Sequence, residues 1–334
     1  MFLSCLKVFH FHIKIPLRWT NSVETIQINS VRIDKLRQAH PTKRNSVSNS
    51  WEQHRVLIAG GTHGFGLVLA KILSRSGASV MVLGRSAEGV REALVQCEAE
   101  AHAAGYSKNQ VQGITADLSH DGEGDRAVAQ CLEKLGGCDS FFFCVGQSSR
   151  SVILKLAPHE IRSSLDANLM TAVEITQAVA DSVCRAHGHL VFIGSLAGKF
   201  VTPAMGNYAI GKSALASFVE AVRLETEPRG GHVLLVSPGP IQRNPAHEAT
   251  LPSIHRYDDQ VARHDLPDSV GQPGGGASVR LLDAEKLAHE ILFSCQQHHQ
   301  ELVRPKKAML LAGLIEWFPS WGRKILNRYT SQKG

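Results

Sequence analysis

The sequence predicts an α/β protein built on a doubly wound parallel sheet, in which helices cover both faces of parallel strands. Two observations support this prediction. From residue 54 to about residue 305, short apolar runs alternate with longer segments whose apolar residues recur at helical spacing. The short runs are also apolar along their whole length, as strands buried on both faces must be.

Seven short runs are expected to form the strands. Each is rich in β-branched, leucine or aromatic residues and stops near glycine, proline or a polar residue, which favours a buried strand over a helix. The last of them, QELVRP, is expected to close the sheet. The runs lie at 55–61, 78–85, 111–119, 138–146, 189–195, 232–240 and 300–305.

The segments between these runs are expected to be helices, because their apolar residues recur every three to four positions. Gly77 and Gly105 are suited to end the first two, and Asp283 is suited to cap the last. The segment 158–188 is predicted to be one long helix. The helices are placed at 67–77, 87–105, 125–137, 158–188, 207–231 and 283–299.

The ends of the chain differ from this alternating middle. Residues 1–53 begin with an apolar stretch broken by Lys and His and continue as a polar stretch, which predicts a disordered or loosely attached leader. A start codon assigned too far upstream explains the same pattern, and a secretory signal is not expected. Residues 54–305 are expected to form the domain, with a long irregular segment at about 240–282, and residues 306–334 an amphipathic tail.

Composition excludes several classes of function. The 334 residues are 43% hydrophobic and 20% charged, an ordinary balance for a globular protein. The net charge of +6 is mild, so no nucleic-acid partner is expected. The 7 scattered cysteines favour reduced thiols and a cytoplasmic location. The histidines at 187–189 and 298–299 lack further ligands at metal spacing, so no metal site is expected.

A glycine-rich turn, AGGTHGFG at 59–66, separates the first predicted strand from the first helix. Gly60, Gly64 and Gly66 would let the backbone approach a pyrophosphate, and the helix N-terminus offers N–H groups and the positive end of a dipole. The turn is therefore predicted to bind a dinucleotide, with a plain turn as the alternative. Its other predicted cofactor contacts are Thr62, His63 and Phe65.

The second strand ends with VLGR, which bears on cofactor choice. An acidic residue near this strand end suits the ribose 2′-hydroxyl of NAD, whereas an arginine suits the 2′-phosphate of NADP. Here Gly84 is followed by Arg85, and His63 could add a second donor. NADP(H) is therefore favoured over NAD(H), with an ordinary surface arginine as the alternative for Arg85.

Residues 207–218, NYAIGKSALASF, carry Tyr208 and Lys212 one helical turn apart, so both should share a face. Free tyrosine has a pKa of about 10, and a nearby ammonium stabilises tyrosinate and lowers that pKa. The pair is thus suited to acid–base chemistry near neutrality. A half-buried tyrosine beside a surface lysine is the alternative.

With these motifs the chain resembles the short-chain dehydrogenase/reductase family, whose members have a Rossmann fold, over roughly residues 54–240 and more weakly to about 305. The family's Y-x3-K pair corresponds to Tyr208 and Lys212, and its catalytic serine to Ser195. Its helix asparagine corresponds to Asn168, and its adenine-contacting aspartate to Asp117. Three further cofactor positions correspond to Gly146, Pro238 and Gly239.

The chain departs from the family at three motifs. Ala59 replaces the threonine of the glycine motif, and Phe143 and Cys144 replace both asparagines of the fourth-strand motif. The threonine that often follows the Pro238–Gly239 pair is not evident. Cys144 is interpreted as a small core residue, with a reactive thiol as the alternative.

The resemblance implies an NADP(H)-dependent oxidoreductase that interconverts a carbonyl and an alcohol. Tyr208 would be the general acid or base, and Ser195 would hold the carbonyl oxygen. Lys212 would also hold the nicotinamide ribose, and Asn168 a water in a proton relay. A non-catalytic cofactor-binding sensor or scaffold on the same fold is the alternative. A homo-oligomer is implied as well, since relatives pair their long helices across a two-fold axis.

The tail at 309–329, MLLAGLIEWFPSWGRKILNRY, combines apolar and aromatic residues with a basic end. Glu316 and Pro319 prevent it from spanning a bilayer as one helix. We expect an apolar-faced helical segment that covers the substrate side or rests on a membrane surface. A faint likeness to the 3-ketosphinganine reductase branch keeps a lipid-like substrate open, and the resemblance makes 240–282 the substrate loop.

Overall fold

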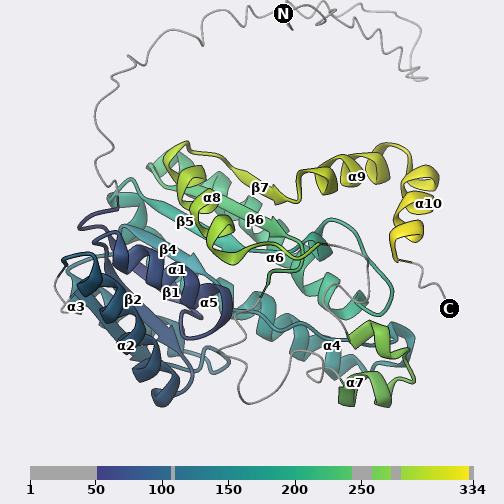
Figure 1. The fold of residues 1–334 in the computed structure, drawn as a ribbon, viewed down its shortest axis with the longest axis horizontal. Coiled ribbons are helices and arrows are strands. Elements are labelled where there is room, and N and C mark those ends of the chain that lie inside the picture. The colour runs from purple at the N-terminus through teal and green to yellow at the C-terminus, as the bar shows by residue number, and fades with distance from the viewer. Residues whose placement is uncertain (1–50, 107–109, 243–257, 272–279, 331–334) are drawn as a thin grey trace, which may run out of the picture. The chain divides into compact units, whose positions relative to one another are not determined.

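The computed structural model describes residues 51–106, 110–242, 258–271 and 280–330 (Figure 1). The predicted leader lies almost wholly outside these residues. Trp51 is buried in the core, with its ring centroid 6.1 Å from that of Phe142 and 5.8 Å from that of His189. The packed domain therefore includes Trp51, three residues before its predicted start at 54.

Seven parallel strands form one sheet in the order β3-β2-β1-β4-β5-β6-β7, which confirms the predicted doubly wound fold. The order reverses between β1 and β4, and ligands of such sheets bind outside the carboxyl ends of the strands at this switch point. The strands are β1 (Arg55–Ala59), β2 (Ser79–Gly84), β3 (Val111–Thr115), β4 (Ser140–Phe143), β5 (His189–Ile193), β6 (His232–Pro238) and β7 (Glu301–Arg304).

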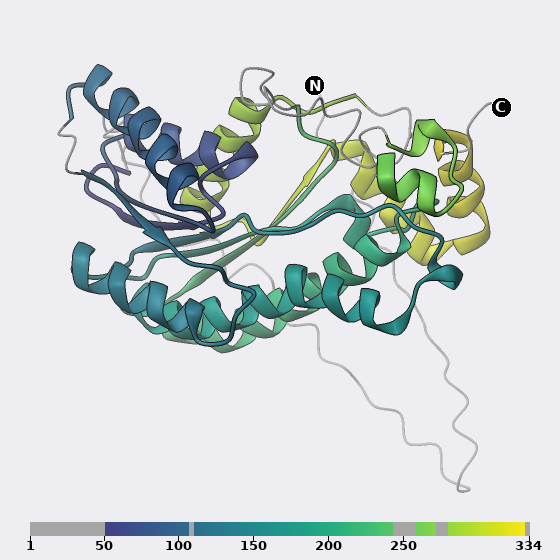
Figure 2. The same cartoon turned by 90° about the horizontal axis from the view of Figure 1, so that it is seen from below.

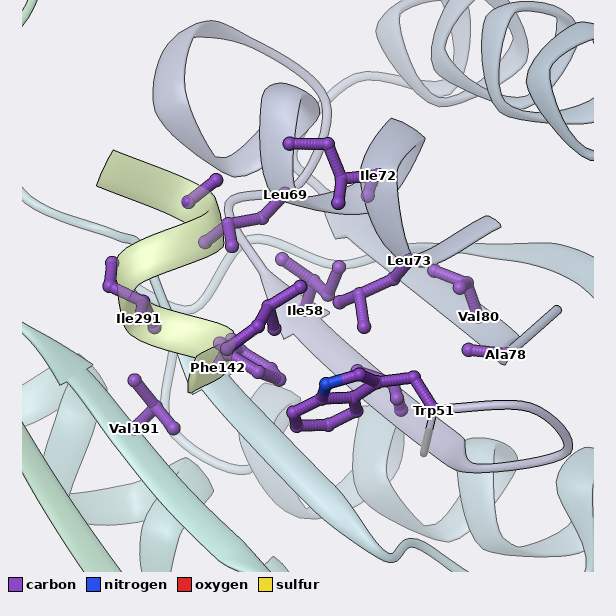
Figure 3. Packing of buried hydrophobic residues seen from close by; sticks show 14 of the residues in the cluster. Trp51, Ile58, Leu69, Ile72, Leu73, Ala78, Val80, Phe142, Val191 and Ile291 are labelled. Atoms are coloured by element: carbon purple, nitrogen blue, oxygen red, sulfur yellow. The ribbon is translucent and has the colours of Figure 1, made fainter. Parts of the chain in front are cut away.

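Helices cover both faces of the sheet, as Figure 2 shows from the side. Successive residues of β1 point to opposite cores: Val56 and Ile58 pack with α1, α2 and α8, while Leu57 and Ala59 pack with α3, α5 and α6. Figure 3 shows part of the core that α1 and α8 form with this sheet. The helices are α1 (Gly64–Arg75), α2 (Ala87–Ala103), α3 (Glu123–Leu135), α4 (Pro158–Leu165), α5 (Thr171–Arg185), α6 (Gly206–Thr226), α7 (Asp258–Arg263), α8 (Ala284–Gln296), α9 (Lys306–Trp317) and α10 (Pro319–Thr330).

The long helix predicted at 158–188 is interrupted, and this prediction was wrong in detail. A π-helical turn, Asp166–Met170, separates α4 from α5. The side chain of Asn168, inside this turn, forms hydrogen bonds with the backbone of Gln147, which follows β4. The departure from α-helical geometry therefore accompanies a tertiary contact. The strands predicted at 55–61 and 138–146 end earlier in the structure, at Ala59 and Phe143. After β1 the chain turns at Gly60, whose φ of 77° is not a strand conformation.

The tail predicted as one helical segment is two packed helices, α9 and α10. Pro319 begins α10, where the fixed φ of proline suits a first helical position and prevents α9 from continuing. A β-carbon at Gly322 would lie 2.6 Å from Ile315 Cα, so the glycine allows the two helices to approach closely. Among the described residues, no helix is both long and apolar enough to cross a membrane.

Histidines cluster at the amino ends of the central strands. His189 and His232 open β5 and β6, and their Nδ1 atoms lie 3.0 Å apart. His232 Nε2 lies 2.9 Å from the carbonyl oxygen of His299, which can only accept, so this nitrogen carries a proton. A neutral His232 then accepts at Nδ1 from His189. Burial lowers the pKa of His189 to about 3 and also lowers the pKa of His232 and His54.

These lowered pKa values predict that the cluster makes stability fall in mild acid. Below about pH 6.5 the unfolded chain protonates its histidines, while folded His189 stays neutral down to a pKa of about 3. The free energy of unfolding should then fall by about 1.4 kcal/mol per pH unit for each such histidine. Urea unfolding at several pH values measures this slope.

His189→Gln should make the slope shallower by close to one histidine's share, because glutamine does not titrate. His102→Gln, at an exposed position of α2, is the matched control and should leave the slope unchanged. Equal slopes for the unmodified chain and His189→Gln would contradict the role assigned to the cluster.

Candidate active site

The residues predicted to bind cofactor or to catalyse lie at the carboxyl ends of the strands. The glycine turn follows β1, Gly146 follows β4, Ser195 follows β5 and Gly239 follows β6. Helix α6 supplies two more of them from its first turns, and the π-helical turn supplies Asn168. One end of the sheet therefore carries all of these predicted positions, as expected for a parallel sheet.

The turn after β1 is shaped as a phosphate cradle. A β-carbon at Gly66 would lie 2.1 Å from the carbonyl oxygen of Gly60, so no other residue fits there. Gly64 has φ of 55° and open space where a side chain would stand. The first hydrogen bond of α1 runs from Leu67 N to His63 O over 3.3 Å, so the N–H groups before Leu67 point out of the helix end. This cradle fits a pyrophosphate.

The end of β2 has no room for the acidic residue that suits NAD. A β-carbon at Gly84 would lie 2.3 Å from Thr62 Cγ2, so Thr62 occupies the place of a side chain there. Arg85, the next residue, is exposed. Thr62 Oγ1 lies 2.8 Å from His63 Nδ1, and the His63 ring lies over Gly89 at the start of α2. Thr62 thus fills the space that an acidic side chain at position 84 would need, and it also orients the His63 ring.

Ser86, which was not predicted from the sequence as a site residue, lies next to Arg85 and completes this group. It is the N-cap of α2, and its Oγ accepts a hydrogen bond from Gly89 N at 2.9 Å. Arg85, His63 and Ser86 therefore gather at a helix N-terminus, where the helix dipole also favours an anion. The signal that could have found Ser86 is a serine placed directly before a predicted helix.

Asp117 follows β3 and so lies at the carboxyl end of the strands, as the glycine turn does. Its Oδ1 accepts hydrogen bonds from Ser119 Oγ at 2.8 Å and from Ser119 N at 3.1 Å. These bonds, with smaller contributions from the charges of His120 and Arg85, lower the pKa of Asp117. Asp117 is therefore a fixed, ionised carboxylate within electrostatic reach of Arg85.

Lys212 is a buried cation and not a surface lysine. Its exposed fraction is 4%, and Nζ donates to the carbonyl oxygen of Ile193 at 3.1 Å. Nζ also lies 5.9 Å from the ring centroid of half-buried Tyr208, one turn earlier on α6. Burial lowers the pKa of Lys212 to about 8, so the ammonium is largely charged at neutral pH. The surface-lysine alternative is thus wrong.

Asn168 is fully buried and holds three elements together. Its Nδ2 donates to Gln147 O at 3.0 Å and to Ser164 O at 2.9 Å, while its Oδ1 accepts from Gln147 N at 3.1 Å. A β-carbon at Gly211 of α6 would lie 3.1 Å from Asn168 Cβ. The π-helical turn, the chain after β4 and α6 therefore meet at this one side chain.

Gly146 lies against both Lys212 and Asn168. A β-carbon at Gly146 would stand 2.8 Å from Lys212 Nζ and 2.9 Å from Asn168 Oδ1. Both distances are shorter than van der Waals contact allows, so glycine is required for these two side chains to hold their places. Three residues predicted from separate motifs are thus brought into one cluster.

Ser195 lies in a loop that packs against the same part of α6. Its Oγ accepts a hydrogen bond from Ala197 N at 3.1 Å, which fixes the hydroxyl oxygen. A β-carbon at Gly198 would lie 2.9 Å from the carbonyl oxygen of Lys212, so the loop approaches the α6 backbone closely. The positions of Ser195 and Lys212 are therefore coupled through this contact.

The chain after β6 is fixed beside the Ser195 loop. Pro238 is buried at the end of β6, and Gly239 N donates to Arg304 O of β7 at 2.8 Å. A β-carbon at Gly239 would lie 3.5 Å from Leu196 Cδ1. The pair was predicted from the sequence to contact the cofactor, and the structure brings it next to the loop of the predicted catalytic serine.

Cys144 has a packing role. Its Cβ would lie 3.1 Å from a β-carbon at Gly66, so it packs against the glycine turn. Desolvation raises the pKa of its thiol to about 12, which keeps it protonated and unreactive at neutral pH. The core interpretation of Cys144 is therefore favoured over a reactive thiol.

Arg150 is a buried residue whose role no motif or periodicity indicated. Its Nε donates to Val270 O at 2.8 Å, and its backbone N–H donates to Gln260 Oε1 at 2.7 Å. It thereby attaches residues 258–271, a described part of the predicted substrate loop, to the chain after β4. Residues 243–257 and 272–279 of that loop lie outside the described residues.

Comparisons with known proteins agree with this geometry. The profile of the short chain dehydrogenase family matches residues 54–251. Dehydrogenase/reductase SDR family member 7B of Bos taurus is 30% identical over 221 residues, which are 65% of this chain and 68% of that protein. The protein of the same name in Danio rerio is 29% identical over 285 residues, 84% of this chain and 86% of that protein.

A solved structure supports the same fold. The apo-form of glucose dehydrogenase of Caenorhabditis elegans superposes with a TM-score of 0.55 over 76% of this chain and 96% of that chain, at 21% identity. The narrower likeness to the 3-ketosphinganine reductase branch stays a prediction.

The crowding at Gly146 predicts that Gly146→Ala will displace Lys212 Nζ or the Asn168 amide. Turnover should fall by at least about tenfold, because small displacements of positioning groups are costly in catalysis. Affinity for a nicotinamide cofactor should fall as well, measured by fluorescence titration. Gly313→Ala is the matched control, since an added β-carbon there meets nothing within 4 Å. Normal turnover and affinity in Gly146→Ala would show that this contact positions nothing.

Proposed function

This chain belongs to the short-chain dehydrogenase/reductase family, and from that premise we propose that it is an NADP(H)-dependent enzyme that interconverts a carbonyl and an alcohol. Members of this family are NAD(P)(H)-dependent oxidoreductases. The observation that carries the proposal is the contact of buried Lys212 and Asn168 with Gly146, with Tyr208 one helical turn from the lysine.

The cofactor would be held along the carboxyl ends of the strands. A nicotinamide cofactor supplies the hydride for carbonyl reduction and accepts it in the reverse reaction. The glycine cradle after β1 would hold its pyrophosphate, and Arg85 with His63 its 2′-phosphate. Asp117 would contact the adenine, and Pro238 with Gly239 would line the nicotinamide end.

Tyr208 would move the proton. Its hydroxyl would donate to the carbonyl oxygen in reduction and take the proton back in oxidation. The pKa of free tyrosine is about 10, so a nearby positive charge is needed to stabilise tyrosinate. The buried ammonium of Lys212 supplies that charge at neutral pH. Tyr208 can therefore act as both acid and base.

Ser195 and Asn168 would orient the groups around this proton. Ser195 Oγ already accepts from Ala197 N, so its hydroxyl hydrogen is available to donate to the substrate oxygen. Both amide hydrogens of Asn168 are used by Gln147 and Ser164, so a relay water would be held by the remaining lone pair of Oδ1. Asn168 is thus mainly a positioning residue.

The non-catalytic alternative rests on the replaced asparagines of the fourth strand. Phe143 is fully buried, and its ring centroid lies 6.3 Å from that of Phe192 and 6.4 Å from that of Phe141. Aromatic packing can therefore brace the strand where relatives use an amide. NADPH oxidation with a panel of ketones distinguishes the two proposals, since a sensor or scaffold would bind NADPH without turnover.

Cofactor choice provides the first test. We expect tighter binding of NADPH than NADH, because Arg85 can pair with the 2′-phosphate and Thr62 excludes an acid at position 84. Such charge-assisted bonds are worth about 1.5 to 3 kcal/mol, roughly tenfold to hundredfold in affinity. Arg85→Asp should erase or reverse the preference, while Arg91→Asp, at an exposed position on α2, should not. Equal affinities for NADPH and NADH in the unmodified chain would refute the predicted preference.

The acid–base assignment provides the second test. Tyr208→Phe removes one hydroxyl and should lower single-turnover NADPH oxidation by about 10² to 10⁴, while NADPH affinity stays normal. Lys212→Ala should lower both the rate of NADPH oxidation and the affinity for NADPH. Ser195→Ala should lower the rate alone. Tyr106→Phe, remote from the site, is the matched control. A near-normal rate in Tyr208→Phe would remove Tyr208 from the mechanism.

A further inference from the structure

The helical hairpin α9–α10 exposes large apolar side chains that the proposed chemistry does not use. Trp317 and Trp321 lie on either side of the bend together with Phe318, and Met309 and Leu310 lie on α9. Their exposed fractions are Met309 59%, Leu310 75%, Trp317 80%, Phe318 61% and Trp321 70%. So many large exposed side chains within one short segment are typical of an interaction surface. We call these five residues the hairpin surface.

The hairpin surface is separate from the residues that pack the hairpin. On α10, the buried residues Gly322, Leu326 and Thr330 recur every four positions and form the packed face. On α9, Leu310 and Trp317 are two turns apart and share the exposed face. The exposed aromatic residues therefore do not hold the two helices together.

The aromatic bend has a defined shape. Phe318 N donates to Leu314 O at 2.9 Å, and Trp321 N donates to Phe318 O at 3.1 Å. These bonds and Pro319 fix the backbone between the two helices, so Trp317, Phe318 and Trp321 are presented by an ordered turn. Tryptophan is suited to the boundary between water and lipid, because its ring is apolar and its N–H needs a polar partner.

The charge of the hairpin is strongly one-sided. Across residues 306–330 the only acidic residue is Glu316. None of the basic side chains forms an ion pair with any residue that the structure describes. All of the basic residues are exposed: Lys306, Lys307, Arg323, Lys324 and Arg328.

We propose that the hairpin α9–α10 docks this protein on a membrane surface that contains anionic lipids. Trp317, Phe318 and Trp321 would enter the headgroup region, and the basic side chains would bind the anionic headgroups. A symmetric contact between two copies is disfavoured, because it would bring the same cations together with a single acid on each side. Neither helix spans the bilayer, so the contact is peripheral.

The hairpin is attached directly beside the candidate active site. Ala308, in the first turn of α9, packs in one small cluster with Leu196, next to Ser195, and with Val303 of β7. Figure 1 shows α9 continuing from the end of β7, at the end of the sheet where the substrate-loop helix α7 also lies. Docking through the hairpin would therefore place the active-site end of the domain towards the membrane. This inference goes beyond the proposed function and does not rest on it.

Vesicle co-sedimentation of the full chain tests the proposal. The chain should bind vesicles of phosphatidylcholine mixed with phosphatidylserine more tightly than vesicles of phosphatidylcholine alone, and salt should weaken the binding. Trp317→Ser with Trp321→Ser should lower the partition coefficient by at least about tenfold, and so should Lys324→Glu with Arg328→Glu. The matched controls, Val95→Ser and Arg91→Glu at exposed positions of α2, should bind as the unmodified chain does.

Two further measurements keep the outcome unambiguous. Tryptophan emission should shift to shorter wavelength with anionic vesicles, and this shift should be lost in the double tryptophan variant. NADPH titration of every variant shows that the domain is folded and separates a failure of docking from a failure of the proposed function. Equal binding to both vesicle types, or binding that persists in the hairpin variants, would overturn the proposal. So would a hairpin-dependent change in mass by light scattering without vesicle binding, because it would assign the surface to a second copy.

Discussion

The burial of one ammonium group is the constraint on which the candidate site depends. Burial lowers the pKa of Lys212 from 10.5 to about 8. At about 1.4 kcal/mol per pKa unit, keeping the ammonium charged in the interior at neutral pH therefore costs about 3 kcal/mol. The chain offsets this cost only in part, through the carbonyl oxygen of Ile193. Such an arrangement is retained where the charge has a use, and the tyrosine one turn away, Tyr208, is the group that a positive charge would activate.

Several features that look separate follow from keeping Lys212 in place. Gly146 must lack a side chain, and Asn168 must be held by a turn that departs from α-helical geometry. Gly198 lets the Ser195 loop reach the backbone of the same lysine. The strand ends, the π-helical turn and the loop therefore form one structure around the ammonium. A substitution at any of them would act on the others.

The sequence predicted the fold well because its signals are local. Apolar strands and periodic helices follow from spacing alone, and the glycine turn and the Tyr208–Lys212 pair are short motifs. What the sequence did not predict depends on contacts between distant segments. The break at Asn168 arises from its bonds to Gln147, and the buried place of Arg150 arises from Gln260 and Val270. No periodicity within 158–188 or near residue 150 carries that information.

The two ends of β5 use burial in opposite ways. At its amino end His189 is kept neutral, with a pKa of about 3, because burial disfavours its charged form. At its carboxyl end the carbonyl of Ile193 accepts from Lys212, which stays charged up to a pKa of about 8. Between these two values each group keeps one protonation state in the folded protein. The predicted acid sensitivity of the fold and the buried charge of the candidate site therefore belong to different groups at the two ends of this 5-residue strand. His189 is part of the strand itself, whereas Lys212 belongs to α6 and donates to the strand's last carbonyl.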